Sequence, residues 1–160
     1  MEANDDYFDL GDYHRAISTL SPEAALWFDR GLIWSYGFNH EEAVACFERA
    51  AAADPRCAMA HWGIAYALGP NYNKPWEFFD ETDLRTRVER THAAVAEAQR
   101  LAPEATPVEQ ALIEALAHRF PTADSAGAAD AWSVWNQDYA AAMTRVHALH
   151  PDDLDVAALT

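Results

Sequence analysis

Apolar side chains recur three and four residues apart through nearly every segment of this chain, the spacing that gathers them on one face of an α-helix. The β-branched residues never cluster with the period-two alternation of a half-buried strand. Alanine, the residue that favours helix most, is abundant throughout. The chain is therefore predicted to fold as an all-α protein.

The first two predicted helices form one hairpin, because their capping signals lie close together. Ser21 is suited to cap a helix that has Pro22 at its first position, where the missing N–H costs nothing. Asn39 is suited to cap the next helix, with Glu42 completing a capping box. Two helices joined by so short a turn pack antiparallel, so residues 21–55 are predicted to form a helical hairpin.

This hairpin resembles the tetratricopeptide (TPR) repeat, a 34-residue unit with W-x2-L-G-x2-Y, then A-x3-F, then a closing proline. Arg30 replaces the leucine of that pattern. The resemblance implies small residues where the paired helices come closest and large aromatic residues between successive pairs. The matching positions are Trp27, Gly31, Trp34, Ala43, Phe47 and Pro55.

The rest of the chain is predicted to continue the same pattern, as a TPR-like solenoid of antiparallel helix pairs with about three repeats and the start of a fourth. An insertion in the second pair is expected to project from the solenoid as a loop. The predicted parts are an N-terminal extension at 1–20 and a repeat domain at 21–160, with repeats at 21–55, 56–103 (inserted loop 70–81) and 104–151, and a partial unit at 152–160.

The final residues begin an apolar stripe that has no room to finish, so we expect a fragment of a longer repeat protein. The exposed end would then be covered by another copy of the chain or by downstream repeats. The alternative is that the terminal turns fold back as a cap. The face concerned is built by Trp132, Trp135, Val146, Leu149 and the terminal VAALT.

Three longer segments resemble one bacterial subfamily of long, mostly uncharacterised TPR proteins. They are ISTLSPEAALWFDRGLIWSYGFNHEEAVACFERAAAADP, CAMAHWGIAYALGPNYN and HPDDLDVAAL. Longer members carry further histidine-containing repeats downstream, beyond the end of this chain. The resemblance carries over the fold and the GFNHEEA and GPNYN segments. A metal or catalytic role of the downstream repeats does not carry over to this chain.

The net charge of −15, from 26 acidic and 11 basic residues, repels phosphate backbones and makes nucleic acid an unsuitable partner. No stretch approaches the roughly 18 apolar residues of a membrane span, so no membrane partner is predicted. Cys46 and Cys57 do not have the spacing of a zinc site or a disulfide framework. These features together predict a cytoplasmic protein.

The first helix of each TPR pair lines a concave groove, and here that groove is predicted to be aromatic. Such a surface suits an extended or helical peptide, or an apolar small ligand. The alternative is that these side chains belong to the core, as helical aromatic stripes commonly do. The predicted groove residues are Phe28, Leu32, Tyr36, Trp62 and Tyr66, with Asn71 and Asn73 in the neighbouring loop.

His61 is the candidate metal ligand, because it replaces an aromatic residue of the repeat beside the GPNYN loop. The alternative is a partly buried histidine hydrogen-bonded across the helix pair. No nucleophile elbow, phosphate loop or HExxH motif occurs, so no catalytic residue and no cofactor is predicted, with a transition metal as the alternative.

Two functions follow from these observations. The first is a scaffold that binds a peptide or protein segment in the groove. The second is a chamber for a metal or small ligand, part of an enzyme whose remaining site lies in downstream repeats or another chain.

Overall fold

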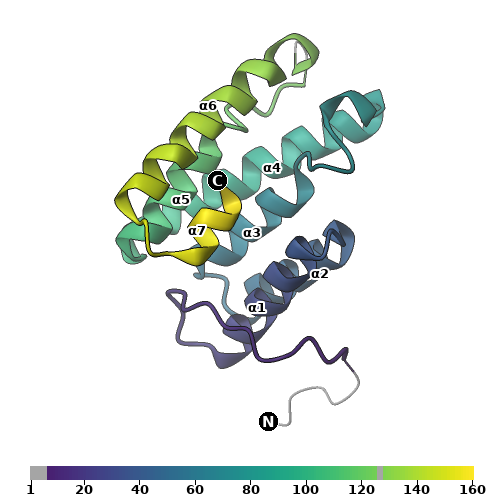
Figure 1. The fold of residues 1–160 in the computed structure, drawn as a ribbon. Helices are drawn as coiled ribbons and strands as arrows, with labels where there is room; N and C mark the ends of the chain where they lie inside the picture. Colours follow the sequence, from purple (N-terminus) through teal and green to yellow (C-terminus); the bar gives the residue numbers. More distant parts are fainter. Residues whose placement is uncertain (1–6, 126–127) are drawn as a thin grey trace.

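The computed structural model describes residues 7–125 and 128–160 (Figure 1). These residues contain helices and no strand, which confirms the all-α prediction. Within the described ranges, no helix combines the length and the apolar character needed to cross a membrane. The helices are α1 (Pro22–Tyr36), α2 (His40–Ala53), α3 (Ala58–Leu68), α4 (Glu81–Leu101), α5 (Pro107–Ala117), α6 (Ala128–Leu149) and α7 (Leu154–Leu159), with the short 3-10 helices η1 (Trp76–Phe78) and η2 (Ala102–Glu104).

Side-chain caps fix the starts of several helices. Ser21 caps α1, and the capping box at Thr106 is complete. Only half of the box predicted for α2 forms. Asn39 accepts a hydrogen bond from the Glu42 backbone N–H at 3.2 Å, whereas the Glu42 carboxylate accepts from the Tyr7 hydroxyl at 2.8 Å. Glu42 therefore ties the N-terminal extension to α2.

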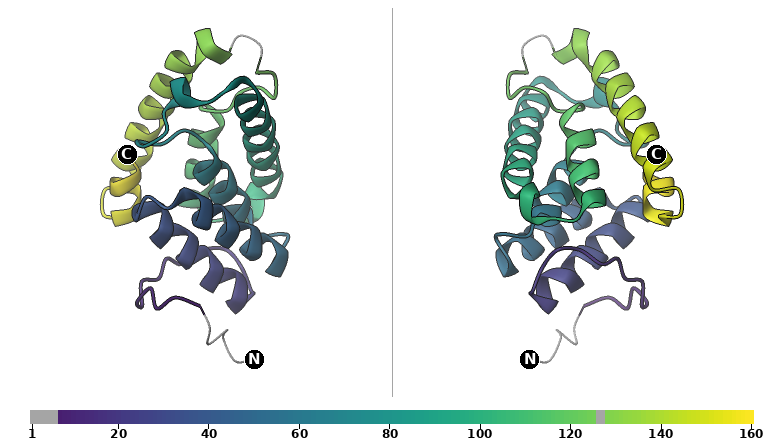
Figure 2. Two further views of the ribbon diagram at one scale, coloured as in Figure 1. Left: turned by 90° about the vertical axis from the view of Figure 1, so that its right-hand side faces the viewer. Right: turned by 90° about the vertical axis from the view of Figure 1, so that its left-hand side faces the viewer.

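Consecutive helices pack against one another along the chain (Figure 1). α1 packs on α2, and α3 packs on both α2 and α4. α1 also contacts α3, and α3 contacts α5. Figure 2 shows α5 between α4 and α6.

The Phe47 ring fills the space where α1, α2 and α3 meet. The ring is fully buried, and a Cβ added to Gly31 would lie 2.5 Å from it. A Cβ on Gly63 of α3 would lie 2.4 Å from the same ring. Both glycines are therefore required by the close approach of one aromatic side chain, which agrees with the spacing role expected of Gly31.

The inserted loop does not simply project from the fold, because its Trp76 is buried at 2% exposure. The Trp76 ring stacks on Trp132 with a centroid distance of 6.1 Å and meets Trp135 edge-on at 6.1 Å. Its large apolar neighbours Tyr72 and Phe78 are exposed. The insertion is thus a structural element that anchors α6.

The chain itself covers part of the end face that was expected to be open. Val146 and Val156 are buried, because α7 folds back onto α6. Leu149 and Leu154 remain exposed. The described part of the N-terminal extension, residues 7–20, also packs on the helices. Association with another copy or with further repeats remains a prediction.

Candidate functional site

Three of the predicted groove residues lie in the core. Phe28, Leu32 and Trp62 are at most 1% exposed, so they cannot contact a ligand in this structure. The physical reason is that neighbouring helices and the Phe47 ring cover the sides of α1 and α3 that carry them. The alternative stated for the aromatic stripe, core packing, holds for these residues.

Tyr36 and Tyr66 lie at the boundary between core and solvent. The Tyr36 hydroxyl donates to Asp155 of α7 at 2.7 Å, and burial together with this bond raises its pKa. The Tyr66 ring stacks on Trp62 at 5.1 Å, and burial raises its pKa while the charge of Arg119 opposes that shift. We use the term inner face for the surface that carries Tyr36, Tyr66 and Arg119.

Asn71 and Asn73 close the turn of the inserted loop. The Asn71 carboxamide oxygen accepts from the backbone N–H groups of Asn73 at 2.9 Å and Lys74 at 3.1 Å. The Asn73 side chain is exposed. The side chain of Asn71 therefore serves the loop itself.

His61 makes a local contact. Its Nε2 lies 3.1 Å from the Pro55 carbonyl oxygen. Among residues 7–125 and 128–160, no three histidine, cysteine or acidic side chains come together as metal ligands would. Burial also raises the pKa of Cys46 and that of Cys57, the latter to about 11, which disfavours the thiolate form that binds metal. Metal binding by His61 stays a prediction, and the described residues do not place a group of further metal ligands beside it.

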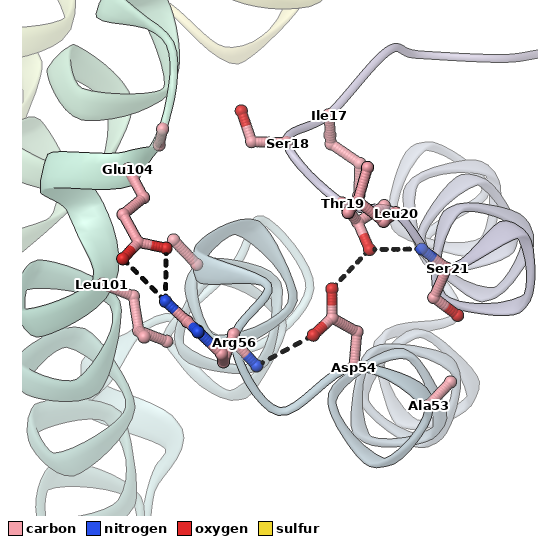
Figure 3. Close-up of a pocket in the computed structure, with 12 residues that line it drawn as sticks. Ile17, Ser18, Thr19, Leu20, Ser21, Ala53, Asp54, Arg56, Leu101 and Glu104 are labelled. Carbon is pink, nitrogen blue, oxygen red and sulfur yellow. Dashed lines mark hydrogen bonds and ion pairs between the residues drawn. The ribbon is translucent and has the colours of Figure 1, made fainter.

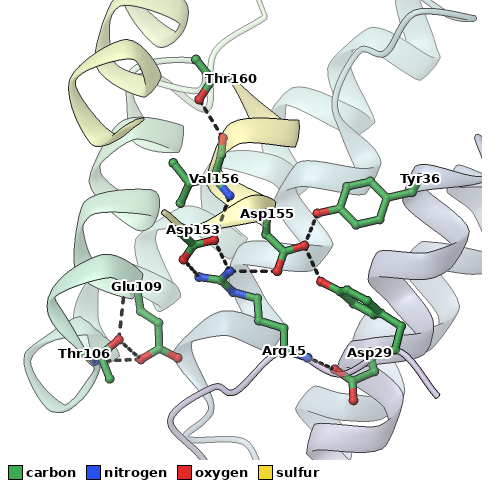
Figure 4. Close-up of polar contacts among 10 residues, drawn as sticks. Arg15, Asp29, Tyr36, Thr106, Glu109, Asp153, Asp155, Val156 and Thr160 are labelled. Carbon is green, nitrogen blue, oxygen red and sulfur yellow. Dashed lines mark hydrogen bonds and ion pairs between the residues drawn. The ribbon is translucent and has the colours of Figure 1, made fainter. Parts of the chain in front are cut away.

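A network of polar contacts joins the N-terminal extension to α7 (Figure 4). The Arg15 guanidinium donates a bidentate pair of hydrogen bonds to Asp153, at 2.8 and 3.0 Å, and a further hydrogen bond to Asp155 at 3.0 Å. The Tyr13 and Tyr36 hydroxyls donate to the same Asp155 carboxylate. The bond from Arg15 lowers the pKa of Asp153, so the pair stays charged at neutral pH. Residues from both ends of the chain thus meet at α1.

A second network joins the extension to α5. The Glu109 carboxylate is 1% exposed and accepts from the backbone and hydroxyl of Ser18, at 2.7 and 2.5 Å. The same carboxylate accepts from the backbone and hydroxyl of Thr106, at 2.7 and 2.8 Å. Four hydrogen bonds satisfy this buried charge, so its role is to hold the extension in place.

A hollow with a volume of about 700 Å³ lies between the extension, the α2–α3 turn and η2 (Figure 3). The charged side chains in its wall already have partners. Arg56 bonds to both Glu104 oxygens at 2.7 Å, and Asp54 accepts from Thr19 at 2.5 Å. The charged side chains that line the hollow are therefore already paired within the protein, and none of them is left to bind a ligand.

A different arrangement surrounds Arg119, just beyond the end of α5. Its Nε donates to the Asn136 side-chain oxygen at 3.3 Å, and its guanidinium lies over the Tyr139 ring at 5.2 Å. Burial lowers the pKa of Arg119. The Tyr139 hydroxyl is buried without a hydrogen-bond partner, and burial raises its pKa. The guanidinium of Arg119 and the hydroxyl of Tyr139 are thus both largely removed from water.

Comparisons of the chain with protein-family models, curated proteins and solved structures gave no match. The assignment of the chain to the TPR family therefore stays with the sequence resemblance.

Arg119, Asn136 and Tyr139 were not among the predicted site residues, although the sequence carries a signal for two of them. Arg119 follows the buried Leu112 and Leu116 at helical spacing, so an arginine continues an apolar face. Tyr139 shares such a face with buried Met143. That these faces meet at one point follows only from the packing of α6 against α5.

Proposed function

We propose that this chain is a TPR-like binding module that holds a short acidic helical segment of a partner protein. The site is the surface formed by Tyr13, Arg15 and Tyr36, which α7 covers here. The observation that carries this proposal is the way these three side chains hold the two carboxylates at the start of α7 (Figure 4). An arginine that grips one carboxylate with two nitrogens is a strong and directional contact.

The few apolar contacts that hold α7 allow a partner segment to replace it at low free-energy cost. The helix has six residues, and Val156 is its one fully buried residue in the structure, whereas Leu154 is 85% exposed. So short a helix is unstable by itself and depends on its contacts. Segments with few buried apolar groups open locally at low free-energy cost. A partner segment with carboxylates spaced as in Asp153 and Asp155 would present the same chemistry.

The test uses the full-length double variant Asp153→Asn/Asp155→Asn, in which α7 loses its charged contacts. The probe is a fluorescein-labelled peptide of residues 151–160, followed by fluorescence anisotropy. We expect saturable binding to this variant. Binding to the unmodified protein should be weaker by about 10-fold or more, because the tethered α7 competes at an effective concentration near the millimolar range.

Two controls make the result specific. A peptide in which both aspartates are replaced by asparagine should not bind. Adding Arg15→Gln to the double variant should abolish binding, whereas adding Arg56→Gln, at an exposed arginine paired with Glu104, should leave it unchanged. Failure of the peptide to bind the folded double variant would contradict the proposed function.

A further inference from the structure

Burial desolvates Arg119, and no carboxylate of the described residues forms an ion pair with its guanidinium, although the chain has a net charge of −15. The ionisable groups that influence it are the phenols of Tyr66 and Tyr139. A guanidinium keeps its charge at all ordinary pH values, so burial without an anion is costly. An external anion would remove that cost.

The surroundings of Arg119 fix its guanidinium and leave one edge free. Asn136 accepts from Nε at 3.3 Å, and the same oxygen lies 3.4 Å from the Trp76 indole N–H. The inserted loop and α6 thus hold the plane of the guanidinium. The two terminal nitrogens make no hydrogen bond to the described residues. These two nitrogens form the fork that matches the two oxygens of a carboxylate.

The neighbouring polar atoms are donors that lack acceptors. The Tyr139 hydroxyl and the Trp62 indole N–H are buried without partners. Tyr66, which stacks on Trp62, is partly exposed, as are Arg119 and Asn136. The cluster therefore has a side that faces solvent. Its unpaired donors and its guanidinium would be satisfied by a hydrogen-bond acceptor that carries negative charge.

We propose that the inner face binds the carboxylate of a small organic acid, with Arg119 as the charged ligand and the Tyr139 hydroxyl as a second donor. One guanidinium neutralises one carboxylate. A phosphate monoester carries about 1.5 to 2 negative charges at pH 7 and would leave excess charge in an acidic protein. The Tyr66 ring, which is partly exposed and stacks on the buried Trp62, suits an acid with an apolar body. Arg119 and Tyr139, the two groups that bind the acid, are not part of the peptide surface proposed above.

The experiment titrates the full chain with benzoate by calorimetry and follows the arginine side-chain Nε–H signals by NMR. Benzamide is the neutral isostere, and inorganic phosphate tests the other anion chemistry. We expect one benzoate site, a shift of the Arg119 signal, and binding by benzamide and phosphate that is weaker by about 10-fold or more, as expected when a charged hydrogen bond is lost.

Variants separate a binding role from a structural one. Arg119→Gln should weaken benzoate binding about 10-fold or more, and Tyr139→Phe about 3-fold or more, because each removes a donor. Arg90→Gln is the matched control, because Arg90 is paired with Glu48 on an exposed surface. If Arg119→Gln does not fold, Arg119→Lys keeps the charge without the fork and should still weaken binding.

Four results would overturn the proposal. The first is that benzoate does not bind the folded protein saturably, and the second is that the Arg119 variants bind benzoate as tightly as the unmodified protein. The third is that benzamide binds as tightly as benzoate, and the fourth is that phosphate binds more tightly than benzoate.

Discussion

At the residue scale, the clearest constraint is that Phe47 leaves no room for a side chain at two glycines. Gly63→Ala should destabilise the fold, because its Cβ would lie 2.4 Å from the Phe47 ring. Overpacking of this kind costs about 1–3 kcal/mol, more than the roughly 1 kcal/mol by which alanine favours a helix over glycine. Urea unfolding measures the loss.

The pair Gly63→Ala/Phe47→Leu tests the cause. Leucine gives up the ring that clashes, so the double variant should lose less stability than the sum of the two single variants. Gly37→Ala is the matched control, because its nearest atom would be at 3.3 Å and the residue is exposed. Strict additivity of the two changes would show that the ring is not the cause.

His40 supplies a prediction about pH. Both ring nitrogens are buried without hydrogen-bond partners, and burial lowers its pKa below the ordinary value of 6.5. In the unfolded chain this histidine takes up its proton near 6.5, whereas in the folded protein it does so only at lower pH. Stability should therefore fall as the pH drops through 6.5, and level off below the folded-state pKa.

The variant His40→Leu should remove this part of the pH dependence, because leucine does not titrate. Urea unfolding at several pH values between 7 and 5 measures the effect. The control is His118→Leu, at an exposed histidine, which should keep the pH dependence of the unmodified protein. An equal slope for the unmodified protein and His40→Leu would contradict the assignment.

At the element scale, the inserted loop decides where α6 lies. Trp76→Ala should cost about 3–5 kcal/mol, the usual range for deleting a buried tryptophan. Since Trp76 contacts Trp132 and Trp135 of α6, the amide hydrogens of that helix should exchange faster with solvent. Hydrogen exchange followed by NMR or mass spectrometry measures this.

Phe78→Ala is the control within the same 3-10 helix, because Phe78 is 70% exposed. It should change neither stability nor exchange by much, since exposed substitutions usually stay within about 0.5 kcal/mol. Faster exchange spread evenly over all helices after Trp76→Ala would mean that the loop does not act on α6 in particular.

At the scale of the whole molecule, the net charge of −15 predicts self-repulsion in the folded state. The ion pairs of Arg56, Arg90 and Arg100 are exposed and contribute little to offset it. Raising NaCl from about 20 to 200 mM shortens the Debye length to below about 10 Å. The thermal midpoint should therefore rise by a few degrees.

Scanning calorimetry at both salt concentrations measures this shift. Choline chloride at equal ionic strength should give the same shift, because screening does not depend on the cation. A midpoint that falls with salt would show that the ion pairs and the Arg15 network outweigh the repulsion.

The sequence by itself determined the helices and their starts. The 3.6-residue spacing of apolar side chains and the caps at Ser21 and Asn39 act within a few residues, so they can be read without knowing the fold. The pairing of α1 with α2 follows in the same way, because a short turn leaves few arrangements. The role of Gly31 beside Phe47 was also readable from its place in the repeat pattern, whereas that of Gly63 was not.

Only the tertiary structure decided which side chains meet. An aromatic residue on a helix can serve either core or groove, and the packing of α3 on its neighbours buried Trp62 and left Tyr66 at the boundary. The cluster at Arg119 joins α5, α6 and the inserted loop, and the contact of Arg15 with Asp153 spans 138 residues. Such contacts depend on how whole helices and loops pack against one another, and the local spacing of residues in the sequence does not determine that packing.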